Sequence, residues 1–191
     1  MASSSLPLDE IDDIDKSIIA LLQETPNITH SEIAKKIGRS QPAVGSRIHR
    51  LEEKGIISSQ FGLNFKNSSG IHLIKVELAT KNPEEILKMG KSCPFIINCM
   101  KLSGENNILI LLASSSLKKI DTIVDYHFRN NDDITNVKMD IITEFLKDFV
   151  LPIDFEMDKH NPEPGVGCGD MCCCKLDNLK LKPTKDPKNK N

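Results

Sequence analysis

The spacing of apolar residues changes once along this chain, and that change limits the folds open to it. Up to about residue 66 apolar residues recur every three or four positions, as in Ile11, Ile14 and Ile18, which predicts helices. From Ile71 onward they alternate in short runs that predict strands, interrupted by two helical stretches. The sequence therefore predicts an α+β protein in which a helical domain precedes a mixed one.

The first region is expected to contain three helices. Asp12 can cap the first, Thr29 or Ser31 starts the second, and Gly38 ends it in a tight turn. Ser40 is a good N-cap for the third helix, which Gly55 closes. Two short extended pieces, at 56–61 and 63–65, are expected to follow and to complete a winged helix-turn-helix over 9–66.

The second region predicts the order β-α-β-β-α-β. Strands are expected at 71–79, 95–102, 107–113 and 134–142, with helices beginning at Asn82 and Ser116. This split βαβ order builds a four-stranded antiparallel, ferredoxin-like sheet with helices on one face. We place this domain at 70–150, followed at 151–191 by a Cys-rich extension and a disordered Lys-rich tail.

Charge and composition exclude several classes of protein. The net charge is only -2, yet six Lys or Arg residues fall within 35–54. No apolar run approaches the ~20 residues needed to cross a bilayer, and the N-terminus lacks an apolar stretch, so we expect a cytoplasmic protein without a membrane partner. No nucleophile elbow, phosphate-binding glycine loop or paired acid–base motif is present, so we do not expect an enzyme.

The second and third helices fit a helix-turn-helix, whose second helix must enter the major groove of DNA. Val44, Ile48 and Leu51 face inward, and short side chains and two arginines are expected on the opposite, exposed side. The alternative is a structural three-helix bundle with a solvated basic face. The predicted DNA-binding residues are Thr29, His30, Ser31, Ser40, Gln41, Ala43, Ser46, Arg47 and Arg50.

Residues 11–57 resemble the winged helix-turn-helix of the Lrp/AsnC (leucine-responsive/asparagine-synthase regulator) family. The family pattern opens with L-D-x-x-D-x-x-I-L, places a helix ending in Gly before S-x-x-x-V-x-x-R, and closes with R-L-x-x-x-G-x-I. The residues of this chain on that pattern are Asp12, Asp15, Ile18, Gly38, Ser40, Val44, Arg47, Arg50, Leu51, Gly55 and Ile57. Gly45, within the third helix, is a less usual residue.

The resemblance extends over about residues 9–148, because the family's effector domain has the same β-α-β-β-α-β order. It implies a DNA-binding transcriptional regulator that forms a homodimer or a higher homo-oligomer. It also implies an effector pocket at the turn Gly104, Glu105, Asn106 and Asn107. Amino-acid-sensing members often have G-x-Y/H-D there, and Asn107 stands in place of the aspartate. A neutral amide pairs weakly with a ligand ammonium, so a purely structural polar turn is the favoured interpretation.

Four cysteines crowd into seven residues of the extension: Cys168, Cys172, Cys173 and Cys174. Thiolates are soft ligands for zinc, copper(I) or iron–sulfur clusters, and an iron–sulfur cluster is the leading expectation. Zinc, or a reactive thiol cluster without metal, are the alternatives. Cys99 lies in a predicted strand and is expected to be a small buried hydrophobe.

Three functions remain open at this point. The first is a regulator that senses redox state or metal through the cysteine cluster. The second is an amino-acid-sensing regulator in which the cysteine tail is incidental. The third is a redox or electron-carrying metalloprotein with a vestigial helix-turn-helix, against which the intact basic face of the third helix argues.

Overall fold

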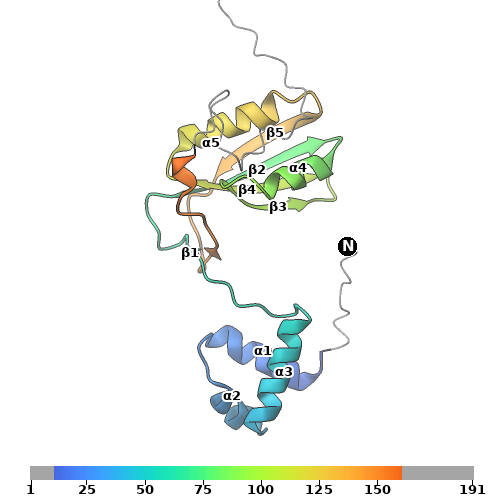
Figure 1. Cartoon of the computed structure of the whole chain (residues 1–191), viewed down its shortest axis with the longest axis vertical. Coiled ribbons are helices and arrows are strands. Elements are labelled where there is room, and N and C mark those ends of the chain that lie inside the picture. Colours follow the sequence, from blue (N-terminus) through green and yellow to red (C-terminus); the bar gives the residue numbers. More distant parts are fainter. Residues whose placement is uncertain (1–10, 161–191) are drawn as a thin grey trace, which may run out of the picture. The chain divides into compact units, whose positions relative to one another are not determined.

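The computed structural model describes residues 11–160, and these form two compact units, one ending at Ser59 and the other beginning at Gln60. Figure 1 shows the three helices of the first unit and the sheet and helices of the second. The α+β fold class expected from the sequence is confirmed. None of the helices in 11–160 is long and apolar enough to cross a membrane.

The first unit consists of α1 (Asp13–Glu24), α2 (His30–Ile37) and α3 (Gln41–Glu53). Reciprocal capping boxes open the first two helices, Asp12 with Asp15 and Thr29 with Glu32. Gly38 ends α2 with φ 65°, a left-handed conformation that glycine adopts without steric cost. The apolar faces of the three helices meet in one core, which contains Ile18, Ile33, Ala34, Val44 and Ile48.

Of the two extended pieces predicted after α3, the one at 56–61 is not a strand, and the one at 63–65 contains β1 (Leu63–Asn64). Residues 54–62 contain no strand, and β1 pairs with β6 (Val150–Leu151), in the second unit. The unit boundary therefore falls at Ser59 rather than at the predicted 66. Gly62 is required at this crossing, because a Cβ there would lie 2.2 Å from the carbonyl oxygen of Leu151.

The second unit has the predicted β-α-β-β-α-β order. Its elements are β2 (His72–Thr80), α4 (Pro83–Gly90), β3 (Ile96–Lys101), β4 (Ile108–Ser114), α5 (Leu117–Val124) and β5 (Ile134–Ile141). The sheet is fully antiparallel in the order β3-β4-β2-β5. A single turn of π-helix, Asp125–Arg129, extends α5 and was not predicted.

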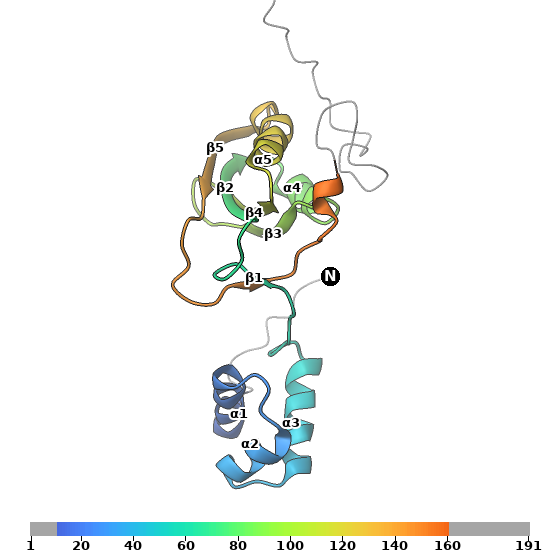
Figure 2. The same ribbon diagram turned by 90° about the vertical axis from the view of Figure 1, so that its left-hand side faces the viewer.

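Both helices of the second unit pack on one face of the sheet, as the sequence predicts. Val76 of β2 lies opposite Ile110 of β4, and both are fully buried in the cluster that contains Ile86 of α4 and Ile120 of α5. Because side chains alternate along a strand, the residues next to Val76 and Ile110 in their strands point to the other face of the sheet. Figure 2, turned by 90°, shows α4 and α5 against the sheet.

The chain beyond β6 folds back onto the second unit. The 3-10 turn Met157–Lys159 buries the Met157 side chain in the core. Asp158 accepts a hydrogen bond of 2.9 Å from Ser114 Oγ, and Lys119 Nζ donates to the Asp158 carbonyl oxygen. The root of the C-terminal extension is therefore fixed at the junction of β4 and α5.

Candidate nucleic-acid interface

The first half of α3 presents short side chains to solvent. Ser40, Gln41, Ala43 and Ser46 are all exposed, as the sequence predicts. Ser40 is the N-cap, but its side chain makes no capping hydrogen bond to the helix. Short exposed residues at the start of a recognition helix allow the helix backbone to approach base edges closely.

The start of α2 adds three more exposed residues, Thr29, His30 and Ser31. The Thr29 hydroxyl is already engaged in capping, since it donates to Glu32 Oε2 at 2.7 Å and accepts from the Glu32 backbone N–H. The hydrogen bond from the Thr29 hydroxyl and then the one from the Thr29 backbone N–H, which donates to Glu32 Oε2 at 2.9 Å, lower the pKa of Glu32. Thr29 is thus the N-cap of α2, and its hydroxyl is occupied by the capping contacts. His30 and Ser31 lie in the first turn of the helix and are not caps.

The His30 side chain lies beside Gly45, the glycine of α3. A Cβ built on Gly45 would lie 3.3 Å from His30 Nδ1, so an alanine at this position would press on the imidazole ring. A glycine is less usual at this place in a helix, and the geometry supplies a reason for it. The glycine weakens α3 by roughly 1 kcal/mol relative to alanine and makes room for His30 beside the exposed face.

The two arginines of α3 are not placed as the sequence predicts. Arg47 Nη1 donates to Asp12 Oδ2 at 2.6 Å and to Asp15 Oδ1 at 2.8 Å, and Arg50 Nη2 donates to Asp15 Oδ2. Their side chains are 31% and 41% exposed, and the Asp15 side chain is 0% exposed. Both guanidinium groups turn toward α1 instead of extending freely from the opposite face, because a buried carboxylate attracts them.

Charge on this surface is stabilised by those same contacts. The Asp15 backbone N–H and the Arg47 guanidinium lower the pKa of Asp12. Hydrogen bonds to Asp12 and then Asp15 raise the pKa of Arg47. Asp12 and Arg47 are therefore ionised throughout the neutral pH range.

Basic residues outside the predicted set flank the exposed end of α3. Lys35 and Lys36 lie in the last turn of α2, and Arg39 lies in the turn between α2 and α3; all three are exposed. The signal that could have selected them was the cluster of positive charge in 35–54. Helical spacing favoured the arginines of α3 within that cluster, although these three residues have the more exposed side chains.

The predicted effector turn is tied into the fold. Asn107 Oδ1 accepts from the Thr80 backbone N–H at 2.9 Å, and Asn107 Nδ2 donates to the Thr80 carbonyl at 2.8 Å. The neighbouring Asn106 Oδ1 accepts from Asn136 Nδ2 at 2.5 Å. The amide of Asn107 thus imitates a peptide group beside the end of β2, which gives it a structural role. Gly104 and Glu105 lie in the same exposed turn.

The predicted cysteine cluster, Cys168 to Cys174, lies outside the described residues. Within 11–160 no group of three or more His, Cys, Asp or Glu side chains is arranged to hold a metal ion. Cys93 is buried and Cys99 is half-buried, and burial raises the pKa of the Cys99 thiol. Cys99 is thus a partly buried strand residue with a protonated thiol.

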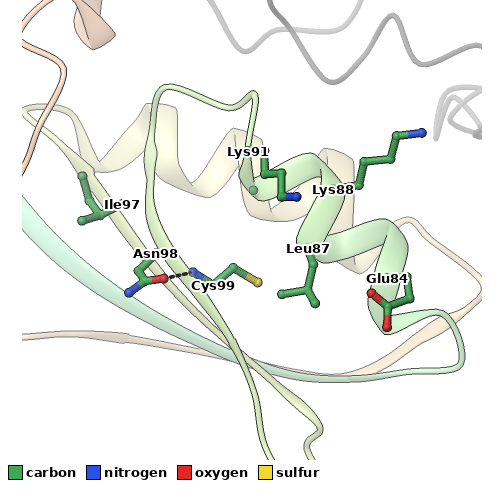
Figure 3. A pocket seen from close by; sticks show the side chains of 8 residues that line it. Glu84, Leu87, Lys88, Lys91, Ile97, Asn98 and Cys99 are labelled. Atoms are coloured by element: carbon green, nitrogen blue, oxygen red, sulfur yellow. Dashed lines mark hydrogen bonds between the residues drawn. The ribbon is translucent and has the colours of Figure 1, made fainter. Parts of the chain in front are cut away.

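A hollow of about 520 Å³ lies between α4 and β3. Leu87 and Cys99 approach each other across it, and Lys88 points away, as Figure 3 shows. Asn98 Oδ1 accepts from the Cys99 backbone N–H at 2.8 Å, which occupies an edge-strand donor. This hollow is distinct from the predicted effector turn.

Comparisons with known proteins agree with this geometry. Residues 11–58 match the family model described as winged helix-turn-helix DNA-binding. The transcriptional regulator LrpA of Pyrococcus horikoshii is 29% identical over 140 residues, which cover 72% of this chain and 99% of that protein. The leucine-responsive regulatory protein of Rhizobium meliloti is 24% identical over 145 residues, covering 73% and 93% of the two chains.

The fold is also that of solved structures. The structure of E. coli AsnC matches with a TM-score of 0.60 at 18% identity, covering 72% of this chain and 95% of that one. A winged helix-turn-helix followed by this α+β unit defines a class of DNA-binding transcriptional regulators. Within that class, the family model, the relatives and the solved structures all support the Lrp/AsnC family for this chain.

Proposed function

We propose that this protein is a sequence-specific regulator that binds double-stranded DNA through the first half of α3. The supporting observation is that the small residues Ala43 and Ser46 are exposed on the face of α3 opposite its buried residues, and that Gln41 is exposed in its first turn. An α-helix fits the major groove, and small side chains bring its backbone within reach of the base edges.

Phosphate contacts are assigned to the residues around those exposed positions of α3. Lys35, Lys36 and Arg39 supply positive charge, and His30 and Ser31 supply hydrogen-bond donors at the start of α2. Such contacts set the register of a protein on DNA, whereas contacts to base edges supply the sequence preference. In this assignment Arg39 and the two lysines contact the DNA backbone, and Arg47 and Arg50, which the sequence predicted as DNA-binding residues, do not.

The proposed regulator acts as a homodimer or a larger homo-oligomer through the sheet face that the helices leave open. Leu109 of β4 lies on this face between Glu77 of β2 and Met100 of β3, and all three are only partly buried. Lys75 pairs there with Glu77 at 3.3 Å and with Asp140 at 3.2 Å. Apolar groups around a paired charge cluster suit burial against a second copy.

Light scattering tests the assembly. We expect at least twice the chain mass of 21.3 kDa at micromolar concentration, and a shift toward monomer in the Leu109→Lys variant. Leu146→Lys is the matched control, because Leu146 is 89% exposed and lies outside the sheet. A wild-type mass of one chain would contradict the assembly.

Selection from a random-sequence duplex library tests DNA recognition. The selected duplex should bind at least roughly 10³-fold more tightly than a scrambled duplex at the same salt concentration. Ser46→Glu should lower affinity at least tenfold by placing a carboxylate toward the DNA. Ser17→Glu, on exposed α1, is the matched control. Equal affinity for the selected and scrambled duplexes would contradict the proposal.

The cysteine cluster supports a finer proposal, that the regulator senses redox state or metal supply through an iron–sulfur centre. Its support is the chemistry of four thiols within seven residues, at Cys168, Cys172, Cys173 and Cys174. A change in that centre can alter DNA binding only if its two states contact the rest of the protein differently. The fixed root of the extension at Asp158 provides one place for such a contact.

A further inference from the structure

Asp15 is a fully buried carboxylate in the DNA-binding unit, and each of its oxygens has a guanidinium partner. Oδ1 accepts from Arg47 at 2.8 Å, and Oδ2 accepts from Arg50 and, at 3.3 Å, from the Asp12 backbone N–H. Asp15 also serves as the N3 acid of the α1 capping box. One side chain thus joins the start of the first helix to the middle of the recognition helix.

The two arginines lie three residues apart in α3 and therefore on one side of that helix. Two bonds from one carboxylate to two points along α3 fix both its rotation about its own axis and its register against α1. The buried Val44 and Ile48 hold the adjacent face, but apolar contacts alone tolerate small rotations better than directed hydrogen bonds do.

We propose that Arg47 and Arg50 are positioning residues that orient the recognition helix through Asp15 and do not contact DNA. The inference rests on the proposed DNA-binding function, and it assigns the two arginines to orienting α3 instead of contacting DNA. An arginine that moved to a phosphate would leave a fully buried carboxylate without its partner, which is strongly unfavourable. Exposed Arg39, in the turn ahead of α3, is the phosphate contact.

The salt dependence of DNA affinity distinguishes the two roles. The slope of log K against log salt is about 0.9 for each phosphate of B-DNA that the protein neutralises. We expect Arg39→Gln to lower the slope by about that amount. Arg47→Gln and Arg50→Gln should leave the slope of binding to a scrambled duplex unchanged, while they reduce the preference for the selected duplex and lower the melting temperature.

Rescue provides the second measurement. Asp15→Asn combined with Arg47→Gln and Arg50→Gln removes all three charges and leaves no buried charge unpaired, since Asp12, the other partner of Arg47, is 51% exposed. The triple variant should therefore be more stable than either single arginine variant. The triple variant also allows the salt dependence to be measured if a single arginine variant does not fold. A wild-type slope in the triple variant supports positioning. A slope lower by about 1.8, twice the value for one phosphate, overturns it.

The Arg39→Gln result separates this inference from the proposed function. If Arg39→Gln lowers the slope and the arginine variants of α3 do so as well, the positioning role is wrong and DNA binding stands. If the wild type shows no preference between selected and scrambled duplexes, the proposed function itself fails.

Discussion

Replacing Asn107 by Asp restores the residue that amino-acid-sensing relatives often carry at this turn, and we expect it to damage the fold. The Asn107 amide gives one donor and one acceptor to the Thr80 peptide group, at 2.8 and 2.9 Å. A carboxylate keeps the acceptor and has no donor. It also places a negative oxygen against the Thr80 carbonyl oxygen, which is left without its partner.

The expected loss of stability is about 2–3 kcal/mol. A hydrogen bond contributes about 1 kcal/mol net, and an unsatisfied, partly buried carbonyl costs about 1–3 kcal/mol. The repulsion raises the pKa of the introduced carboxyl group in the folded state above its unfolded value. Stability is therefore retained below the unfolded pKa, where the protonated carboxyl again donates, and is lost as pH rises through the folded pKa.

Urea unfolding monitored by tyrosine fluorescence measures this effect in the second unit alone, because Tyr126 is the only tyrosine and the chain has no tryptophan. Asn106→Asp is the matched control. Its side-chain oxygen accepts from Asn136, which a carboxylate still can do. If Asn107→Asp stays within about 0.5 kcal/mol of wild type, or if Asn106→Asp loses as much, the structural role of Asn107 is refuted.

Three further predictions concern other parts of the chain. Gly45→Ala should stabilise the first unit by up to about 1 kcal/mol, because alanine favours the helix and the exposed His30 can move aside. The displacement of His30 should weaken DNA binding. A lower melting temperature by circular dichroism would contradict the expected gain in stability. Burial lowers the pKa of His127 to about 4, so the second unit should lose up to about 3 kcal/mol as pH falls from 6.5 toward 4. His127→Gln should abolish that loss, and an unchanged pH profile would refute it. Protein purified without oxygen should contain iron and acid-labile sulfide, which the Cys172→Ser, Cys173→Ser double variant should lack; iron-free wild type rejects the cluster.

The sequence predicted the elements whose signals are local. Each strand of the four-stranded sheet was expected within two residues of its observed ends, because alternation and turn residues lie within the strand itself. The caps at Asp12 and Ser116 were also expected, and both side chains accept backbone hydrogen bonds. Exposure of Ala43 and Ser46 followed from the helical period.

The rest depends on contacts between residues far apart in the chain. The pairing of β1 with β6 involves two residues on each side, too few to show a period. The arginines of α3 satisfied the same helical spacing as the exposed residues, and only the buried Asp15 distinguishes them. The amide of Asn107 could be weighed chemically in advance, but its partner Thr80 could not be named.

The two-stranded ribbon of β1 and β6 allows the second unit to be joined to a different N-terminal unit. Leu63 lies opposite Leu151 in an antiparallel pair, so the chain leading into β1 and the chain leaving β6 depart from the same end of the ribbon. None of the four strands of the main sheet takes part in that pairing. A different N-terminal unit can therefore be joined ahead of Gln60, which keeps Gly62, without cutting or reordering the sheet. Gene fusions at that point should yield chimaeras that fold.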